Sequence, residues 1–263
     1  MHHSALLVDL GNTLCKSRLL TWGSGPGAQW QALQITDNPF ELLDLSHSLE
    51  SVYIASVRSD DVNAELQRQF EEKGVDFHLI KTEAQQFGLK NSYQNVSKMG
   101  VDRWLAMLGA QLFAEQSYMV IDAGTAITCD AVVNLQHLGG WIAPGYSLLQ
   151  QAVTANTARV TSAEFNDSPL QFGEDTEACL HFGCIAQVQG LISAGTLLMN
   201  NNTSQFHTII SGGDLQKLQF LTLPDKPFPP IFIENIVMFG LLRFAFANTP
   251  LDKLMKLATQ LAR

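Results

Sequence analysis

The chain has 263 residues, a length that suits one large domain or two domains of ordinary size. Hydrophobic residues make up 46% of the sequence and charged residues 16%, so the chain can bury a sizeable core. The formal net charge of -9, with no cluster of Lys and Arg, argues against a nucleic-acid-binding surface.

Cysteine usage and hydropathy favour a cytoplasmic protein without a membrane segment. The cysteines form no CxxC pair and follow no cleavable signal segment, so we expect reduced, mostly buried thiols. The apolar stretch from Ile236 to Ala247 is interrupted by Arg243 and is too short to span a bilayer. The cysteines are Cys15, Cys129, Cys179 and Cys184.

Strands and helices alternate along the first part of the chain. Ser59 is a candidate N-cap, acidic residues follow it, and Gly74 suits a C-terminal stop, so a helix is expected from Ser59 to Lys73. Apolar residues at helical spacing predict a second helix over 102–113. Runs with β-branched or alternating character predict strands at 5–8, 14–22, 31–35, 52–57 and 77–80.

The pattern then begins again. The segment LLVDLGNT at Leu6–Thr13 and the segment MVIDAGTA at Met119–Ala126 each contain an apolar strand, an Asp, a Gly and then a Thr or Asn-Thr. Two copies predict two structurally similar halves, 1–116 and 117–263, each with a loop at the exit of its first strand. Two such loops that face each other across a cleft would hold a polyphosphate between them.

The residue types in these loops suit phosphate binding. Glycine lets the backbone approach a ligand so that N–H groups point at phosphate oxygens, and Asn and Thr add neutral donors. The aspartate would hold Mg²⁺, directly or through water, and the metal would bridge phosphate oxygens. A strand-ending turn needs the same residues, so one copy alone is weak evidence.

Other catalytic motifs are missing from the sequence. It contains no G-x-x-x-x-G-K-[ST], and the glycine-rich segment at Gly23–Ala28 has neither the P-loop lysine nor the G-x-G-x-x-G spacing. No H-E-x-x-H or G-x-S-x-G occurs, so zinc peptidase and serine hydrolase functions have no support.

The segment NSYQNVSKMGVDRW places Gly100, Asp102 and Arg103 where an irregular loop enters an amphipathic helix. An Asp at a helix start is often only a cap. The functional interpretation is that Asp102 accepts a proton from a substrate hydroxyl while Arg103 holds an anionic or polar part of the substrate.

Taken together, the motifs resemble the type III pantothenate kinases, members of the acetate and sugar kinase/Hsp70/actin superfamily. The resemblance spans nearly the whole chain. It implies an α/β fold of two ribonuclease H-like halves, each a mixed sheet flanked by helices, with ATP bound in the cleft between them. The motifs are DLGNT at 9–13, GVDRW at 100–104, DAGTAITCD at 122–130, GGWIAPG at 139–145, ANTARV at 155–160 and SGGD at 211–214.

The resemblance implies ATP-dependent phosphorylation of the primary hydroxyl of pantothenate to 4′-phosphopantothenate, the first step of coenzyme A biosynthesis. Asp102 would be the proton acceptor, Asp9 would lie near Mg²⁺, and Asp122 would help to bind K⁺ or NH₄⁺. Members of this family are cytoplasmic homodimers. ATP contacts would come from Asp9, Leu10, Gly11, Asn12, Thr13, Leu14, Cys15, Lys16 and Thr125, and pantothenate contacts from Tyr93, Gly100, Val101, Asp102, Arg103 and Thr176.

Several of these residues also have plain structural interpretations. Tyr93 is also consistent with a half-buried aromatic residue whose hydroxyl is in contact with water. Thr176 is also consistent with the N-cap region of a helix, and either Asp122 or Asp130 with a side chain that only accepts hydrogen bonds from backbone N–H groups. A helix is expected over 177–199, where Gly183, Gly190 and Gly195 favour close helix packing, including packing across a dimer.

Two other functions stay open at this stage. One is a kinase of the same superfamily that acts on another small alcohol or on acetate. The other is a non-catalytic regulatory relative that keeps the fold and nucleotide binding and acts through a protein partner. The presence of both Asp9 and Asp102 argues against the regulatory alternative.

Overall fold

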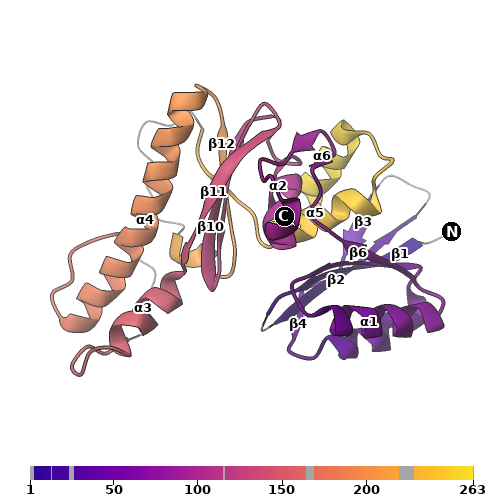
Figure 1. The fold of residues 1–263 in the computed structure, drawn as a ribbon, viewed down its shortest axis with the longest axis horizontal. Coiled ribbons are helices and arrows are strands. Elements are labelled where there is room, and N and C mark those ends of the chain that lie inside the picture. The colour runs from indigo at the N-terminus through magenta and orange to yellow at the C-terminus, as the bar shows by residue number, and fades with distance from the viewer. Residues whose placement is uncertain are drawn as a thin grey trace. The chain divides into compact units, whose positions relative to one another are not determined.

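The structure, a computed structural model, describes residues 3–12, 14–23, 27–114, 116–163, 169–218 and 228–262. It contains two compact units. Unit 1 consists of Met1–Phe113 and Ile236–Arg263, and unit 2 consists of Ala114–Asn235. Figure 1 shows the elements of both units with the labels used below.

Unit 1 is built on a mixed sheet with the strand order β3-β2-β1-β5-β6, in which β4 also pairs with β2. The central strand β1 pairs antiparallel with β2 and parallel with β5, and β5 pairs parallel with β6. The elements before the chain enters unit 2 are β1 (His3–Leu10), β2 (Cys15–Trp22), β3 (Ala28–Trp30), β4 (Gln34–Thr36), η1 (Pro39–Ser48), β5 (Ser51–Ser56), α1 (Asp60–Glu72), β6 (Asp76–Ile80), β7 (Gln85–Gln86), β8 (Leu89–Lys90), η2 (Val96–Lys98) and α2 (Val101–Ala110). After unit 2, the chain returns to unit 1 with α5 (Ile236–Ala245) and α6 (Leu251–Leu261).

Unit 2 repeats this arrangement, with its strands in the order β13-β12-β9-β10-β11. The central strand β9 pairs antiparallel with β10 and parallel with β12, as β1 does with β2 and β5. This shared topology confirms the two similar halves that the repeated motif predicts. The elements are β9 (Tyr118–Ala123), β10 (Ala126–Val133), β11 (Gln136–Pro144), α3 (Tyr146–Thr154), α4 (Thr176–Asn202), β12 (His207–Ser211), η3 (Leu215–Leu218) and β13 (Ile231–Phe232).

Helices cover both faces of the unit 1 sheet (Figure 1). Leu6, Val8 and Leu10 of β1 pack in one core cluster with residues of α1 such as Leu66. Side chains alternate along a strand, so Asp9 projects toward the opposite face. That face is covered by α5, which contacts β1 and β5, and by α2, which contacts β5. The sheet alternation therefore places Asp9 on the same face as the helix that carries Asp102.

The last segment of the chain belongs to unit 1, which differs from the predicted division into 1–116 and 117–263. The reason is a close crossing of α5 over α2. A Cβ added at Gly240 would lie 2.3 Å from the carbonyl oxygen of Leu105, and one added at Gly109 would lie 2.5 Å from that of Ile236. Only glycine permits backbones to approach so closely, so these positions fix α5 onto α2.

Most predicted elements are confirmed, with shifted ends. Ser59 is the N-cap of α1 and Gly74, at φ 76°, follows its end. The predicted helix over 102–113 is α2, which begins at Val101 and ends earlier, at Ala110. The single strand predicted at 31–35 is wrong, because β3 and β4 are two short strands that both pair with β2.

Helix α4 is the longest element of unit 2 and is apolar along its length. Among the described residues, α4 is long and apolar enough to cross a membrane, but the buried core helix of a globular protein can have the same length and composition. Ile192, Met199 and Val188 pack in one core cluster with residues of β9 and β10. The helix therefore supplies much of the core of unit 2 (Figure 1).

The α2–α5 crossing makes a stability prediction. We expect Gly240→Ala to lower the free energy of unfolding by about 1–3 kcal/mol, because the added methyl group meets rigid backbone of Leu105. Gly213→Ala is the control, since a Cβ there meets nothing within 4 Å. Thermal and urea unfolding of both variants measure the effect. Equal stability of the two variants would contradict the close crossing.

Candidate functional site

The first predicted phosphate loop is a tight connection between β1 and β2. Leu10 pairs with Cys15, and the Gly11 N–H donates a hydrogen bond of 3.0 Å to the carbonyl of Leu14. A Cβ at Gly11 would lie 3.1 Å from the same oxygen, so the turn favours glycine. Asn12 is exposed and Gly11 is partly exposed, which leaves both available to a ligand. Thr13 lies outside the described residues.

The flanking side chains of this loop differ in accessibility. Leu10 and Cys15 are fully buried in the core cluster of unit 1, so only their backbone can contact a nucleotide. Burial, reinforced by the nearby Asp9 carboxylate, raises the pKa of the Cys15 thiol to about 12. Cys15 is therefore a neutral core residue at physiological pH. Lys16 lies opposite Asp9 in the register of β1 and β2 and is partly exposed, and Leu14 is exposed.

Asp102 lies in the first turn of α2, two residues after Gly100, whose lack of a Cβ leaves room for the carboxylate. A Cβ at Gly100 would lie 2.3 Å from Oδ1 of Asp102. This Oδ1 accepts a hydrogen bond of 2.8 Å from the Arg103 N–H. Among the described residues, Oδ2 of Asp102 has no hydrogen-bond partner. The carboxylate is thus held by one oxygen, and the other is available to a ligand.

Arg103 and Tyr93 form a pair beside this carboxylate. Nη1 of Arg103 donates a hydrogen bond of 3.0 Å to the Tyr93 hydroxyl, and the guanidinium carbon lies 5.8 Å from the centre of the Tyr93 ring. Arg103 is only 5% exposed. The Tyr93 N–H donates to Oδ1 of Asn91, which fixes the loop before η2. The structure therefore brings together Tyr93, Gly100, Asp102 and Arg103, all within unit 1.

The second predicted phosphate loop connects β9 to β10. The Gly124 N–H donates to the carbonyl of Ala126, and the carbonyl of Thr125 accepts a hydrogen bond of 3.0 Å from the Gly145 N–H. A Cβ at Gly145 would lie 1.9 Å from the Gly124 oxygen. Gly145 of the GGWIAPG segment thus supports the loop and leaves the Thr125 side chain exposed.

The SGGD segment packs against the same loop. Gly212 has a φ of 105°, and a Cβ there would lie 2.2 Å from the carbonyl oxygen of Ala123. The Asp214 N–H donates a hydrogen bond of 2.9 Å to this oxygen. Three motifs that are far apart in the sequence therefore meet in unit 2.

Other polar residues in unit 2 have structural partners. Oδ1 of Asp130 lies 3.1 Å from Nε2 of His137, and both side chains are buried. The Tyr146 hydroxyl and Nδ1 of His181 share a buried hydrogen bond of 2.6 Å, and burial raises the pKa of Tyr146 to about 12. Thr176 is the exposed first residue of α4, after the N-cap Asp175, which accepts from the Ala178 N–H.

Each unit has one aspartate near the end of its central strand that a cation can reach. Asp9 and Asp122 are the penultimate residues of the equivalent strands β1 and β9, and both are partly exposed. In the described part of the chain, no group of three or more His, Cys, Asp or Glu side chains could hold a metal ion. A single carboxylate such as that of Asp9 suits Mg²⁺, which proteins usually hold through one or two carboxylates together with substrate phosphates and water.

A polar residue that the sequence analysis missed supports the first loop. Nε of Arg58 donates a hydrogen bond of 2.7 Å to the carbonyl of Gly11. Arg58 lies two residues after the end of β5, the strand that pairs with β1, and the N–H of the intervening Val57 donates to the Leu10 carbonyl. Only the position of this arginine at the carboxyl end of a predicted strand could have indicated its role.

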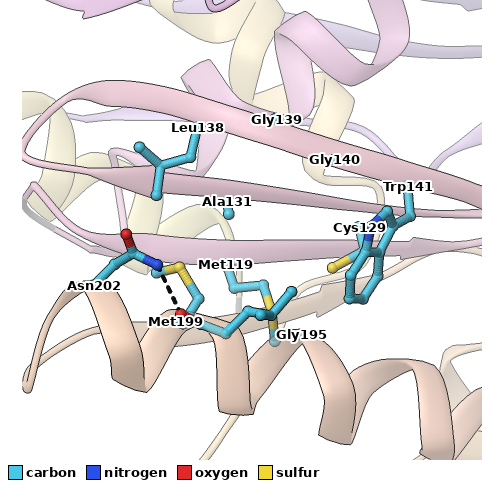
Figure 2. Close-up of a pocket in the computed structure, with 11 residues that line it drawn as sticks. Met119, Cys129, Ala131, Leu138, Gly139, Gly140, Trp141, Gly195, Met199 and Asn202 are labelled. Carbon is cyan, nitrogen blue, oxygen red and sulfur yellow. Dashed lines mark hydrogen bonds between the residues drawn. The ribbon is translucent and has the colours of Figure 1, made fainter.

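A cavity of about 350 Å³ opens beside Gly100 and Val101 in unit 1. A second cavity, of about 270 Å³, lies in unit 2 between α4 and the strands β10 and β11 (Figure 2). Figure 2 shows Met119, Trp141 and Met199 around this second cavity. Among the described residues, its lining contains no Asp, Glu, His, Lys or Arg, so no ionised side chain faces it.

Comparison with known proteins agrees with this geometry. The family model for type III pantothenate kinase matches residues 5–196. The type III pantothenate kinase of Pseudoalteromonas atlantica is 35% identical over 244 residues, which cover 92% of this chain and 98% of that protein. The enzyme of the same name from Pseudoalteromonas translucida is 33% identical over 232 residues, which cover 87% of this chain and 92% of that protein.

Solved structures show the fold at lower identity. A Campylobacter jejuni protein assigned to the Baf family of transcriptional activators superposes with a TM-score of 0.58 at 20% identity, covering 92% of this chain and 98% of that one. A Sinorhizobium meliloti protein assigned as a 2-dehydro-3-deoxygalactonokinase also gives 0.58, at 15% identity, covering 94% of this chain and 99% of that one. Both show the two-sheet mixed α/β fold.

The burial of Cys15 predicts how readily its thiol reacts. We expect Cys15 to resist iodoacetamide at pH 8, because its thiol is fully buried and its pKa is raised to about 12, whereas the exposed Cys179 reacts readily. Peptide mapping by mass spectrometry compares the two rates. The pKa of Cys15 is higher in the folded state than its ordinary value of 9.0. The contribution of the neutral thiol to the free energy of unfolding is therefore fully present below pH 9.0 and is lost as pH rises toward 12. Equal alkylation of both residues would contradict a buried Cys15.

Proposed function

The chain belongs to the type III pantothenate kinase family, and from this membership we propose that it transfers the γ-phosphoryl group of ATP to the primary hydroxyl of pantothenate. The products are 4′-phosphopantothenate and ADP, in the first step toward coenzyme A. The observation that carries the proposal is Asp102, whose Oδ1 is held by the Arg103 N–H and which lies within the family match. This function fits better than a regulatory one, since Asp9 and Asp102 are both in place.

Asp102 is the proposed general base. Its Oδ1 is occupied by the Arg103 N–H, so Oδ2 accepts the proton of the pantothenate hydroxyl as the oxygen attacks phosphorus. Phosphoryl transfer needs little covalent chemistry from the protein, so positioning and charge neutralisation supply most of the rate enhancement. Gly100 supports this role because its lack of a Cβ leaves room for the carboxylate, whose Oδ1 is held by the Arg103 N–H.

Both loops are proposed to bind ATP. In the first loop, Gly11 offers backbone close to the phosphates, Asn12 offers neutral donors, and Leu10 and Cys15 contribute through the backbone alone. In the second loop, the exposed Thr125 offers its hydroxyl. The SGGD segment, which packs against Ala123, is proposed to lie near the adenosine of the nucleotide.

Two cations complete the proposed site. Mg²⁺, when bound, would bridge and neutralise phosphate oxygens, and Asp9 is the residue that would hold it, directly or through water. Asp122 would help to bind the monovalent cation K⁺ or NH₄⁺. The equivalent positions of these two aspartates on β1 and β9 support separate roles for them, one in each unit.

Pantothenate is proposed to contact Tyr93, Gly100, Val101 and Arg103 in unit 1. Arg103 is buried and oriented by the Tyr93 hydroxyl, which supports a fixed guanidinium for the anionic or polar part of the substrate. Thr176 of unit 2 is also proposed to contact pantothenate, and its exposed position at the start of α4 leaves its hydroxyl available.

A homodimer in the cytoplasm is the proposed form of the enzyme. Gly183 and Gly190 are exposed on α4 and a Cβ at either position meets nothing within 4 Å, so packing among the described residues does not require glycine there. Glycine inside a helix costs about 0.5–1 kcal/mol relative to alanine. Leu197, two turns further along, is 66% exposed. This stripe suits the close approach of a helix from a second copy.

The kinase assignment predicts the behaviour of an Asp102 variant. We expect ADP release that depends on pantothenate and on K⁺ in the wild type, and a kcat about 10²–10⁴-fold lower in Asp102→Asn, the usual contribution of a general base. A coupled assay with and without pantothenate, in K⁺ and then in Na⁺, measures both. Asp130→Asn, which changes the buried pair with His137, is the control for loss of folding. A wild type that binds ATP without pantothenate-dependent turnover would overturn the assignment.

The stripe on α4 predicts the oligomeric state. We expect the wild type to elute as a dimer in size-exclusion chromatography with light scattering and Gly190→Arg to shift toward the monomer, because a long charged side chain blocks the close approach. Asn200→Arg, exposed on the same helix, is the control and should remain dimeric. A wild-type monomer, or an unchanged dimer in Gly190→Arg, argues against this surface as the interface.

A further inference from the structure

The cavity of about 350 Å³ in unit 1 is lined by polar side chains that are not among the proposed pantothenate contacts. It opens at the carboxyl ends of β5 and β6, where open α/β sheets usually bind ligands. Gly100 and Val101 form one side of it, so it lies next to the segment that carries Asp102. The remaining lining residues are Ser56, Val57, Arg58, Asp60, Asn63, Leu79, Ile80, Lys81, Thr82, Ser97 and Met99.

Arg58 is half-buried on the wall of this cavity, and its guanidinium is only partly used. Nε donates to the Gly11 carbonyl at 2.7 Å, which fixes the side chain beside the first phosphate loop. Among the described residues, Nη1 and Nη2 have no hydrogen-bond or ion-pair partner. A fixed guanidinium with unused N–H groups presents a planar set of donors that matches a carboxylate or a phosphoryl group.

The charge around the cavity also favours an anion. Its titratable lining groups are the two cations Arg58 and Lys81 and the single carboxylate Asp60. The cavity also borders the N-terminus of α1, where Ser59 makes no side-chain capping bond and the helix dipole adds positive potential. The balance of charge on the wall is therefore positive in a protein whose net charge is -9.

Asn63 gives an independent sign of a ligand. Its side chain is only 8% exposed, it lines the cavity, and its Oδ1 has no hydrogen-bond partner among the described residues. Its Nδ2 donates a long hydrogen bond of 3.5 Å to the Arg58 carbonyl. A buried oxygen without a hydrogen-bond partner is unfavourable, so this site favours a ligand that brings a hydrogen-bond donor. Pantothenate has hydroxyl and amide donors as well as a carboxylate.

We propose that Arg58 binds an oxyanion of the reacting complex in this cavity through Nη1 and Nη2, and that Asn63 accepts a hydrogen bond from the same ligand. The inference rests on the proposed function, because the oxyanion is either the carboxylate of pantothenate or the phosphoryl group in transfer. Arg58 also connects the two parts of the site in unit 1, since it bonds the loop at Gly11 and shares the cavity with Gly100.

The test compares Arg58→Gln with Arg68→Gln. Arg68 lies on the exposed side of α1, where it pairs with Glu65 and Glu72, so its variant controls for the loss of one positive charge. Calorimetry gives the Kd of each protein for pantothenate, for its uncharged alcohol analogue panthenol, and for ADP and a non-hydrolysable ATP analogue, each with Mg²⁺. Steady-state kinetics with pantothenate and with panthenol gives kcat and KM.

Two results support the proposal and identify the oxyanion. If Arg58 binds the carboxylate, Arg58→Gln weakens pantothenate binding by about 10- to 100-fold, the range for losing a charged hydrogen bond, and leaves panthenol unchanged. If it binds the phosphoryl group, kcat falls by at least about tenfold with both substrates while all four Kd values stay the same. In both cases Arg68→Gln behaves as the wild type.

Two other results overturn it. If Arg58→Gln has wild-type binding and kinetics, Arg58 has no role in the reaction, even if the variant is less stable. A loss confined to nucleotide binding, and equal for ADP, which lacks the transferred phosphoryl group, and for the ATP analogue, shows that Arg58 only supports the Gly11 loop. A wild type that does not phosphorylate pantothenate is a separate result, because it overturns the proposed function before either arginine variant is compared.

Discussion

Close approach of backbone to backbone, at positions where a side chain cannot fit, shapes the loops on which the proposed chemistry depends. In unit 2, Gly145 and Gly212 bring two distant segments against the loop that follows β9. In unit 1, Gly11 closes the equivalent loop after β1. These contacts leave little room for the loops to rearrange, so their N–H groups and exposed side chains are prepositioned for a nucleotide.

The close backbone contacts at glycine have different consequences in the two units. Each sheet has a central strand with a penultimate aspartate, Asp9 or Asp122, and the same order of neighbouring strands. Unit 1 adds α2, whose first turn carries Asp102, and α5 fixes this helix in place through Gly240. The duplicated framework thus supplies the two loops that are proposed to bind phosphate, and α2 of unit 1 supplies the proposed general base.

Local patterns made much of this predictable. The repeated motif revealed two similar halves, and the caps of α1 set its ends, because both signals lie within a few residues of sequence. Long-range contacts were not predictable in the same way. Nothing local places α5 on α2, pairs Asp130 with His137 across a hairpin, or brings Arg58 to Gly11. The strand error at 31–35 has a similar cause, since two short edge strands depend on pairing with β2.

The central claim is that phosphorus moves from ATP to the primary hydroxyl of pantothenate, and proton-coupled ³¹P NMR of the reaction tests it most directly. A phosphomonoester on that hydroxyl gives a triplet, because phosphorus couples to the protons of the neighbouring CH₂ group. We predict this triplet together with ADP in the wild type, and strongly delayed growth of it in Asp102→Asn. Inorganic phosphate alone, or the doublet of an ester on the secondary hydroxyl, would contradict the account.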